Sequence, residues 1–348
     1  MNEPKYILKL PEAIGLFPKG ESVIERSHAA QLLRYSGPEI TTLAPGEYRP
    51  LSTHGAKAGQ TVLFVRPGGF GDMLFITPTM RALKEQCPKL HIQLSAIPKY
   101  AEAVRYDRAI DEILPYPPTL EAFRRADAHV WLERILEDAG DAKTVPAVEM
   151  IARHAGVVVE DYSMRYELFG DEWKWGKKAY PHRKGGRVGI QVQASALNRT
   201  YPAGQLNRVM NELVARGWEV FLFGDPGSVE ADEPFVNLTN KGYTFRQSCA
   251  ILNTCDVVIA PDSALCHVAA ALNKPTVALF GPFPSAIRSV HESTVRALDG
   301  TAPCAPCHHH DNTGIPWPEG CPGWRSGQCA ALQSITPEKI VETVTSLL

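Results

Sequence analysis

The sequence contains no long uninterrupted run of apolar residues. An ordinary membrane-spanning helix needs about 18–20 of them, so such a segment is not expected. The first residues, MNEPKYILKLPEAIG, also lack the basic stretch, apolar stretch and cleavage site of a secretion signal. These two absences favour the cytoplasm, with peripheral attachment at the inner membrane as the other option.

An excess of charge of one sign is also absent. The chain has 36 Lys and Arg residues against 38 Asp and Glu residues, a formal net charge of -2. A protein that binds nucleic acid or an anionic membrane over a broad surface usually carries a clear basic excess. Nucleic acid is therefore disfavoured as a partner.

The common nucleotide-binding loops are missing as well. The stretch GGFGD (68–72) does not have the GxGxxG spacing of a dinucleotide site, and no GK[ST] follows it as in a P-loop. The chain also has no redox CxxC beside a βαβ unit. A dehydrogenase, a P-loop ATPase and a metal-dependent oxidoreductase are all disfavoured.

What the sequence does contain is an ordinary globular composition. Of its 348 residues, 44% are hydrophobic and 21% are charged, as in a folded protein rather than a disordered one. A chain of this length exceeds one typical hydrophobic core, so two domains are expected.

From residue 61 onward, predicted strands alternate with predicted helices. The run TVLFV (61–65) is typical of a strand buried on both faces, and a helix is predicted at 72–86. Further strands are predicted at 91–97, 112–116 and 126–132, and helices at 100–106 and 146–157. The alternation predicts a parallel sheet with helices on both faces.

A second alternation begins at residue 187. Before it, residues 169–186 (FGDEWKWGKKAYPHRKGG) combine charge, aromatic residues and glycine, which predicts a linker. Strands are predicted at 187–194, 218–223, 256–260 and 275–281, and helices at 204–217, 245–255, 263–273 and 336–348. The last helix has Thr336 as its cap and Pro337 at its first position.

The fold class is therefore α/β, with two Rossmann-like, doubly wound domains facing each other across a cleft. We expect an N-terminal accessory segment over 1–60, a first domain over 61–175, a second domain over 186–335 and a C-terminal helix over 336–348. The accessory segment has a predicted helix at 27–37, and its role cannot be inferred from its residues. Ligands of such sheets bind beyond the carboxyl ends of the strands.

The first loop of interest is RPGGFGD (66–72), which follows the first buried strand. Its glycines let the backbone approach a ligand closely, and Asp72 stands at the start of the next helix. Taken alone, Asp72 is more often a helix cap than a catalytic carboxylate. Gly69, Phe70 and Gly71 are expected to line the same binding region.

Three further loops follow strands of the second half. In SALNRTYP (195–202), Ser195 and Arg199 could hold a diphosphate, because Arg presents a planar fork to phosphate oxygens. The loop GDPGSVEADE (224–233) could place a carboxylate, with Glu230 as our choice, near ribose hydroxyls.

The loop PDSALCHVAAAL (261–272) is the most informative. Asp262 and Ser263 end a buried strand at the start of a helix, and His267 lies one turn after Ser263 on the same helix face. A single histidine in an apolar helix is usually a core residue. Its place behind Asp262 and Ser263 favours a ligand site instead.

Together these loops resemble glycosyltransferase family 9, the heptosyltransferase family with the GT-B fold. The resemblance covers residues 61–348 and is strongest in VRPGGFGDMLFITPTMRALKEQ and in the segment from NLTNKGYTFRQSC to KPTVALFGP. It implies an inverting transfer of a hexose or heptose from a nucleotide-diphospho-sugar to an acceptor hydroxyl. The first domain would then bind the acceptor and the second the donor, an ADP-sugar by family expectation.

The resemblance also implies roles for individual residues. Asp72 matches the general base that deprotonates the acceptor hydroxyl. Ser195 and Arg199 match positions that hold the donor diphosphate. Asp262 matches a residue that contacts the donor sugar, and the turn that binds the donor includes Ser263, Ala264 and His267. Backbone amides and Arg199 can stabilise the leaving diphosphate, so the chemistry is expected to need no metal.

The chain departs from the family pattern at several positions. Gly68 and Gly69 stand where a Ser-Ser or similar pair is usual, Ala264 where glycine is usual, and Arg199 where lysine is common. These changes leave the sugar and the acceptor open, and heptose is only the family expectation.

Four of the eight cysteines are concentrated near the C-terminus, in a Cys-rich loop over 304–329. Cys304 and Cys307 form a CxxC pair, and Cys321 and Cys329 follow, a set that can complete a tetrahedral zinc or iron site. The histidines at 308, 309 and 310 are additional candidate ligands. The alternative is that these thiols stay free or pair under oxidation. The other four, at 87, 249, 255 and 266, are expected in the core.

These observations leave three functions to compare. The first is a glycosyltransferase that builds lipopolysaccharide or another bacterial surface glycan on a glycan or lipid-linked acceptor. The second is a glycosyltransferase that acts on protein or modified nucleic acid. The third is a non-catalytic nucleotide-sugar-binding protein, in which Asp72 is only a cap.

Overall fold

The computed structural model describes residues 5–35, 37–138, 141–181, 185–231, 233–309, 321 and 327–347, and it divides into two compact units. Unit 1 consists of Met1–Ala142 with Ala147–Tyr162, and unit 2 of Lys143–Pro146 with Ser163–Leu348. Each unit contains its own parallel sheet. Within the described residues, no helix is long and apolar enough to cross a membrane.

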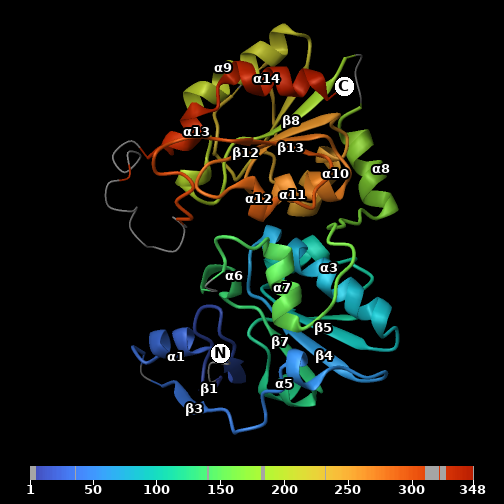
Figure 1. The fold of residues 1–348 in the computed structure, drawn as a ribbon, viewed down its shortest axis with the longest axis vertical. Coiled ribbons are helices and arrows are strands. Elements are labelled where there is room, and N and C mark those ends of the chain that lie inside the picture. Colours follow the sequence, from blue (N-terminus) through green and yellow to red (C-terminus); the bar gives the residue numbers. More distant parts are fainter. Residues whose placement is uncertain are drawn as a thin grey trace. The chain divides into compact units, whose positions relative to one another are not determined.

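The sheet of unit 1 has four parallel strands in the order β6-β5-β4-β7. Its strands are β4 (Thr61–Val65), β5 (His91–Ala96), β6 (Glu112–Pro115) and β7 (Ala128–Trp131). The helix expected after β4 is α3 (Phe70–Gln86), which packs against α7 (Ala147–Ala155) (Figure 1). The shorter helices are α4 (Pro98–Ala101), η1 (Glu102–Val104), α5 (Leu120–Arg125) and α6 (Ile135–Asp138).

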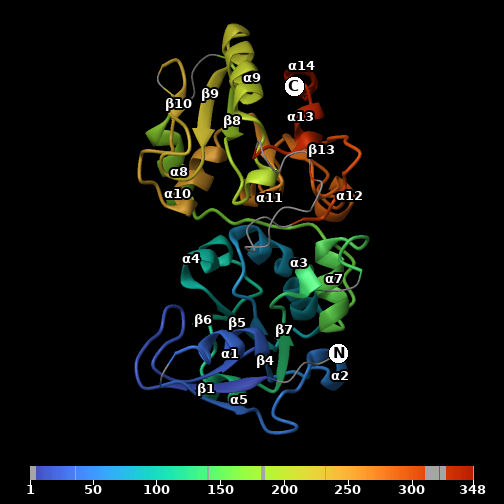
Figure 2. The ribbon, with the colours of Figure 1, turned by 90° about the vertical axis from the view of Figure 1, so that its left-hand side faces the viewer.

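The N-terminal segment forms a small antiparallel sheet in the order β2-β1-β3. Its elements are β1 (Tyr6–Leu10), β2 (Gly20–Ile24), α1 (Arg26–Leu32), β3 (Glu39–Thr42) and α2 (Leu51–His54). Val23 and Leu43 share a hydrophobic core with Leu63 and Val65 of β4. Figures 1 and 2 show this segment, in dark blue, beside the four-stranded sheet. The segment is therefore built onto the first sheet.

The sheet of unit 2 has six parallel strands in the order β10-β9-β8-β11-β12-β13. Its strands are β8 (Arg187–Gln191), β9 (Glu219–Phe223), β10 (Val236–Asn237), β11 (Val257–Pro261), β12 (Thr276–Phe280) and β13 (Val295–Asp299). Its helices include η2 (Leu197–Arg199), α9 (Ala203–Ala215), α10 (Phe245–Leu252), α11 (Ala264–Ala271), α12 (Ser285–Arg288), α13 (Ala330–Ser334) and α14 (Pro337–Ser346). Figure 1 shows α9 and α14 along one face of this sheet, and α10, α11 and α12 along the other.

The predicted helix at 204–217, which is α9, and the predicted cap of α14 are both confirmed. The apolar positions of α9 are buried in one core with α13 and α14: Leu206, Val209, Met210 and Leu213. The Thr336 hydroxyl accepts a hydrogen bond from the backbone N–H of Lys339 at 3.2 Å. Local sequence signals therefore place these helices correctly.

The predicted linker over 169–186 is wrong for its first part, where the structure has the helix α8 (Gly170–Ala179). The Phe169 N–H donates to Glu172 at 2.9 Å and starts the helix. Glu172 also pairs with Arg246 of α10 at 2.6 Å, and a Cβ on Gly176 would lie only 2.5 Å from the Ala250 carbonyl oxygen. The helix is stabilised by contacts with α10, about 70 residues away, which a local sequence pattern does not reveal.

The core placement expected for four cysteines holds for three of them. Cys249, Cys255 and Cys266 are buried, as predicted, whereas Cys87 is partly exposed. Cys87 follows the last residue of α3, where the chain leaves the helix, and this position explains its exposure.

Candidate active site

The sheet topology identifies one position in each unit where a ligand site is expected. In unit 1, β4 has β5 on one side and β7 on the other, and in unit 2, β8 lies between β9 and β11 in the same way. From such a central strand the chain first continues to the strands on one side and later returns to the strand on the other side. The loops on the two sides therefore separate at the carboxyl end of the central strand. The candidate residues lie in the segments after β4, β8 and β11, at the carboxyl ends of these strands.

In unit 1, Asp72 lies in the first turn of α3. Its Oδ2 atom accepts a hydrogen bond from the Gly69 N–H at 2.7 Å and forms an ion pair with Arg66 Nη2 at 3.2 Å. The Asp72 side chain is 29% exposed, so solvent can reach it. Asp72 therefore caps its helix and remains accessible for chemistry.

The glycines before Asp72 have a steric role of their own. Gly68 has φ +39°, and a Cβ there would lie 2.7 Å from Met73 Cε and 3.0 Å from Asp72 Cβ. Gly69, Phe70 and Gly71 are half-buried, and the Phe70 ring packs edge-on against Tyr100 at 5.1 Å. The space beside Gly68 is thus filled by the turn itself, and Gly69, Phe70 and Gly71 remain the candidates for acceptor contact.

Arg66 was not among the predicted site residues. It is 3% exposed, and its Nη1 donates to the Leu132 carbonyl oxygen at 2.7 Å while its Nη2 faces Asp72. Arg66 therefore ties the loop after β4 to the loop after β7. A charged residue directly after the run TVLFV was the signal that could have revealed it.

In unit 2, Arg199 connects the loop after β8 to the end of β11. Its Nη2 donates to Ser195 Oγ at 2.9 Å, and its Nη1 donates to the Asp262 carbonyl oxygen at 3.0 Å. The Arg199 Nη1 atom also lies 3.7 Å from Asp262 Oδ2. The structure thus brings together Ser195, Arg199 and Asp262, as the sequence predicted.

His267 and Asp262 belong to a buried network of charged side chains. His267 Nε2 lies 3.8 Å from Asp262 Oδ1, and His267 Nδ1 lies 2.6 Å from Glu292 Oε1. Arg288 Nε lies 3.7 Å from Asp262 Oδ2, and the Arg288 guanidinium is 4.3 Å from the centre of the Phe283 ring. The sequence did not predict Arg288 or Glu292, which belong to the segment between β12 and β13.

The charges in this network determine each other's protonation. Burial alone would raise the pKa of the Asp262 carboxyl, but Arg288, His267 and Arg199 hold it well below its usual range. Burial favours the neutral form of His267, but Glu292 and Asp262 outweigh it and raise the pKa of His267 to about 9. At neutral pH, Asp262 is therefore a carboxylate and His267 an imidazolium.

The remaining predicted donor residues differ in their placement. Ser263 caps α11 as its N-terminal flanking residue and hydrogen-bonds through Oγ to Gln191, the last residue of β8. Ala264 is the first residue of α11 and is half-buried. Glu230 is exposed on the loop after β9, and among the described residues no hydrogen bond or ion pair joins it to the others. The structure therefore does not place Glu230 in the cluster.

The side chains of Cys266, His267 and Glu292 could in principle share a metal ion, since their ligand atoms all lie within 4.8 Å of one another. Both ring nitrogens of His267, however, already face carboxylates, one of them at hydrogen-bond distance. We therefore interpret this group as an ion-pair network.

The four cysteines of the Cys-rich loop line one small cavity of ≈ 20 Å³. The cavity is also lined by Asn198, Gly281, Pro282, Ala305, His309 and Ala330. Burial, together with the neighbouring thiols, raises the pKa of Cys307 and of Cys329. A space of this size exceeds the roughly 10–15 Å³ that one small occupant needs. The prediction of a shared site for Cys304, Cys307, Cys321 and Cys329 fits this geometry, and residue 310 lies outside the described residues.

The cysteine cavity adjoins the donor candidates through Asn198. This residue is 4% exposed, precedes Arg199 in η2 and donates a hydrogen bond to the His309 carbonyl oxygen at 2.8 Å. His308 packs edge-on against Phe283 at 5.7 Å, and Phe283 in turn contacts Arg288. The Cys-rich loop therefore contacts Asn198, the neighbour of Arg199, and Phe283, which packs against Arg288.

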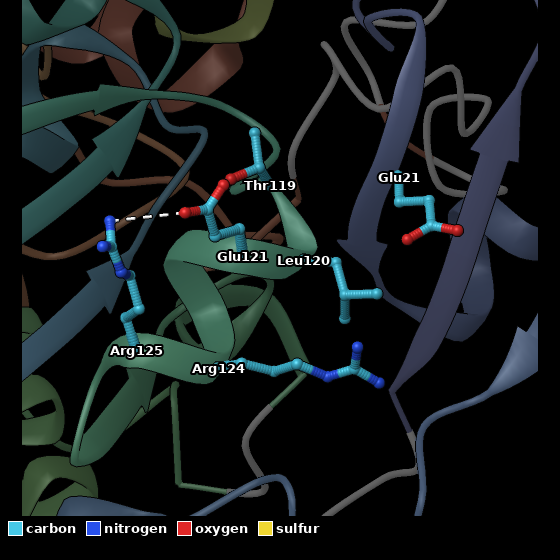
Figure 3. A pocket seen from close by; sticks show the side chains of 6 residues that line it. All are labelled: Glu21, Thr119, Leu120, Glu121, Arg124 and Arg125. Atoms are coloured by element: carbon cyan, nitrogen blue, oxygen red, sulfur yellow. Dashed lines mark ion pairs between the residues drawn. The ribbon is translucent and has the colours of Figure 1, made fainter.

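A separate hollow of ≈ 480 Å³ lies in unit 1 between β2 and α5 (Figure 3). It is lined by Glu21, Thr119, Leu120, Glu121, Arg124 and Arg125. Its cations are already paired, Arg125 with Glu121 at 3.4 Å and Arg124 with Glu47 at 2.7 Å. We therefore assign no ligand to this hollow.

Comparison with solved structures identifies the fold. The chain aligns with ADP-heptose lipopolysaccharide heptosyltransferase II of Escherichia coli over 83% of this chain and 98% of that one, with a TM-score of 0.64 and 17% identity. A family 9 glycosyltransferase of Veillonella parvula gives a TM-score of 0.66 over 84% and 98% of the two chains, with 15% identity. The fold is that of a GT-B glycosyltransferase, as the sequence predicted.

A third structure aligns with the whole chain, including the N-terminal segment. It is the iron-containing dodecameric glycosyltransferase TibC of enterotoxigenic Escherichia coli, with a TM-score of 0.62, 15% identity and coverage of 100% of this chain and 92% of that one.

Sequence comparison finds similarity to heptosyltransferases. Residues 147–317 match glycosyltransferase family 9 (heptosyltransferase). Lipopolysaccharide heptosyltransferase 2 of Escherichia coli K12 is 23% identical over 82% of this chain and 98% of its own length. Lipopolysaccharide heptosyltransferase 1 of Pseudomonas aeruginosa is 30% identical over 32% of this chain and 33% of its own length. These matches agree with the resemblance to glycosyltransferase family 9 and, together with the fold, support glycosyltransferase activity.

Proposed function

We propose that the protein is an inverting glycosyltransferase that transfers heptose from ADP-heptose to an acceptor hydroxyl during the assembly of lipopolysaccharide or another surface glycan. The observation that carries the proposal is the cluster at the carboxyl ends of β8 and β11, where Ser195, Arg199, Asp262 and His267 come together. The sugar and the acceptor class are those of the lipopolysaccharide heptosyltransferases that the chain resembles.

In this proposal, Asp72 acts as the general base in unit 1. A hydroxyl is a weak nucleophile at neutral pH, and a carboxylate that takes its proton strengthens the attack on the anomeric carbon. The attack displaces the nucleoside diphosphate and inverts the configuration at that carbon. Arg66 and the Gly69 N–H hold the Asp72 carboxylate in one orientation.

In unit 2, Arg199 and the start of α11 receive the diphosphate. Charge accumulates on the diphosphate as the glycosidic bond breaks, and fixed donors stabilise it without reorganisation. Ser195 orients Arg199 through their hydrogen bond at 2.9 Å, and Asp262 contacts the donor sugar. No step in this scheme uses a metal.

The cysteine cavity is proposed to hold a structural zinc or iron ion. Four thiolates are a suitable ligand set for either ion, and the cavity accepts one small occupant. Cys304, Cys307, Cys321 and Cys329 would hold it, and the ion would fix the Cys-rich loop against Asn198. One solved relative is described as iron-containing, which supports iron as the first ion to test.

A protein acceptor is the second candidate, and the N-terminal segment favours it. His28 of α1 lies 3.1 Å from Glu133, next to the loop after β7, and Val23 of β2 donates to the Pro118 carbonyl oxygen at 3.0 Å. The segment thus extends the surface near the loops after β6 and β7, where a large acceptor could be recognised.

The proposal is tested by incubating the protein with a panel of nucleotide sugars and acceptors. ADP release and the acceptor mass are followed together. We expect ADP-heptose to be consumed with a glycan or lipid-linked glycan acceptor, and a mass gain on added protein would select the second candidate. Donor binding with no release across the panel would instead indicate a nucleotide-sugar-binding protein.

A further inference from the structure

We propose that Glu292 is a positioning residue of the donor site: it keeps His267 protonated and aligned, so that His267 holds the Asp262 carboxylate in place. The inference rests on the proposed function for the identity of the donor. It assigns a role to a side chain that contacts neither the donor nor the acceptor in that scheme.

His267 lies between two carboxylates. Its side chain is 3% exposed, and each ring nitrogen faces a different carboxylate. Nδ1 lies 2.6 Å from Glu292 Oε1, and Nε2 lies 3.8 Å from Asp262 Oδ1. A neutral imidazole has one N–H donor and one acceptor, whereas an imidazolium has two donors. Only the imidazolium can offer a proton to both carboxylates at once.

Glu292 is as deeply buried as His267. Its side chain is 4% exposed and lies in the segment between α12 and β13. A buried carboxylate without a counter-charge is strongly unfavourable, so Glu292 and the protonated His267 stabilise each other. The short distance of 2.6 Å is that of a charge-assisted hydrogen bond.

The protonation of His267 also determines how much of the positive charge of Arg199 is available to the diphosphate of the donor. The groups that face one another here are the cations Arg199, Arg288 and His267, the anions Asp262 and Glu292, and the thiol of Cys266. If His267 lost its proton, Asp262 would be neutralised by the two arginines alone. Arg199 would then be drawn toward Asp262 and away from the diphosphate.

The test compares Glu292→Gln with the parent protein at pH 6 and pH 8.5. Glutamine keeps the size of the side chain and removes its charge, so burial should lower the pKa of His267. We expect the variant to bind ADP about threefold more weakly at pH 8.5 than the parent does, and nearly as well at pH 6, because a fall of the His267 pKa by one unit from about 9 lowers its protonated fraction about threefold at pH 8.5 and hardly at pH 6. Glu292→Asp should restore the affinity at pH 8.5.

The matched control is Glu219→Gln, which removes another carboxylate of unit 2 that pairs with a buried cation, Arg187, at 2.8 Å. It should lower stability without a pH-dependent change in ADP affinity. NMR of the imidazole, assigned by its loss in His267→Gln, reports the protonation of His267 directly. Neither the NMR signal of His267 nor ADP binding requires sugar transfer. The role of Glu292 can therefore be refuted while the proposed function stands, and the proposed function can be refuted while the role of Glu292 stands.

The proposal is overturned if His267 titrates at the same pH in Glu292→Gln and in the parent, or if the loss of ADP affinity is equal at both pH values. If Glu292→Gln does not fold, His267→Gln takes its place. We expect that variant to bind ADP weakly at both pH values, and parental affinity at pH 8.5 would equally refute the role of the imidazolium.

Discussion

Gly68 is the residue that most narrowly determines the shape of the turn before Asp72. Its φ of +39° is unfavourable for other residues, and the atoms closest to a new Cβ are the Met73 and Asp72 side chains. The turn leads to the only first-turn acid of α3, whose carboxylate the Gly69 N–H and Arg66 hold. A change at Gly68 should therefore act on stability and on Asp72 together.

We predict that Gly68→Ala lowers the free energy of unfolding by roughly 1–3 kcal/mol, because the backbone is strained and Met73 must move. Chemical denaturation measures the change. Gly204→Ala is the control, since a Cβ at Gly204 meets nothing within 4 Å and a helix favours alanine. Equal stability of Gly68→Ala and the parent would contradict the account of the turn.

At the scale of the elements, the N-terminal segment is joined to the first sheet by a buried ionisable cluster. Lys5 lies 3.5 Å from Glu25, His28 lies 3.1 Å from Glu133, and Tyr116 donates to Glu133 at 2.8 Å. Burial and the charge of Glu133 raise the pKa of Glu25 to about 7, although Lys5 opposes them. The attachment of this segment should therefore depend on pH.

The raised pKa of Glu25 determines how the stability of the fold changes with pH. The folded state binds this proton more tightly than the unfolded chain, so the associated stability is present below pH 4.5 and is lost as the pH rises through about 7. Glu25→Gln should raise the melting temperature at pH 8, by about 2–4 °C for each kcal/mol gained, and change it little at pH 5.

The control for Glu25 is Glu39→Gln, which breaks the exposed pair with Lys9 and should leave the melting temperature unchanged at both pH values. Scanning calorimetry of the full chain measures all three proteins. A melting temperature that Glu25→Gln lowers at pH 8 would show that the charged form of Glu25 stabilises the segment, against our account.

The elements that the sequence predicted correctly share strong local patterns. The buried run of β4, the amphipathic α9 and the cap of α14 each carry their signal within a few residues. The helix α8 was missed because its stability comes from Glu172 and Gly176 packing on α10. Elements with a strong local pattern could therefore be predicted from the sequence, whereas an element stabilised by long-range packing could not.

The candidate site divides in the same way. Asp72, Ser195, Arg199, Asp262 and His267 follow strands, and the topology of a parallel sheet brings such residues to its carboxyl edge. Arg288 and Glu292 belong to α12 and to the segment after it, which has no clear periodicity, so only the folded chain shows that they reach Asp262 and His267. Glu230 was chosen from an acidic loop without a geometric reason, and it lies outside the cluster.

At the scale of the whole molecule, the cysteine cavity connects a proposed metal to donor binding. Asn198 lines the cavity, and its neighbour Arg199 contacts Ser195 and Asp262. Loss of the metal should loosen the Cys-rich loop and, with it, the position of η2. Donor affinity and metal content should therefore change together.

We predict that Cys307→Ser weakens the metal affinity by at least about 10-fold to 100-fold, the loss typical of a disturbed metal site. The purified variant should then contain clearly less than the roughly one ion per chain expected of the parent. Metal content is measured by mass spectrometry of the purified protein, and ADP affinity by calorimetry, where a severalfold loss is expected. Cys87→Ser, which changes a partly exposed cysteine outside the cavity, serves as the control. A parent protein that contains disulfides between these cysteines would contradict the metal site.

The central claim is that this chain catalyses sugar transfer with Asp72 as the general base. Asn at position 72 keeps the size of the side chain and its ability to accept from the Gly69 N–H, but it cannot take a proton. General bases typically contribute about 10²–10⁴-fold to the rate. The loss should therefore fall on kcat, while the affinity for ADP-heptose, which we propose unit 2 binds, stays within about twofold of the parent.

The direct measurement is the rate of ADP release from ADP-heptose by the parent and by Asp72→Asn, with the same acceptor and at the same pH. We predict a fall in kcat of about 10²-fold or more with unchanged donor affinity. Equal turnover by the two proteins would show that Asp72 only caps α3, and would contradict the account.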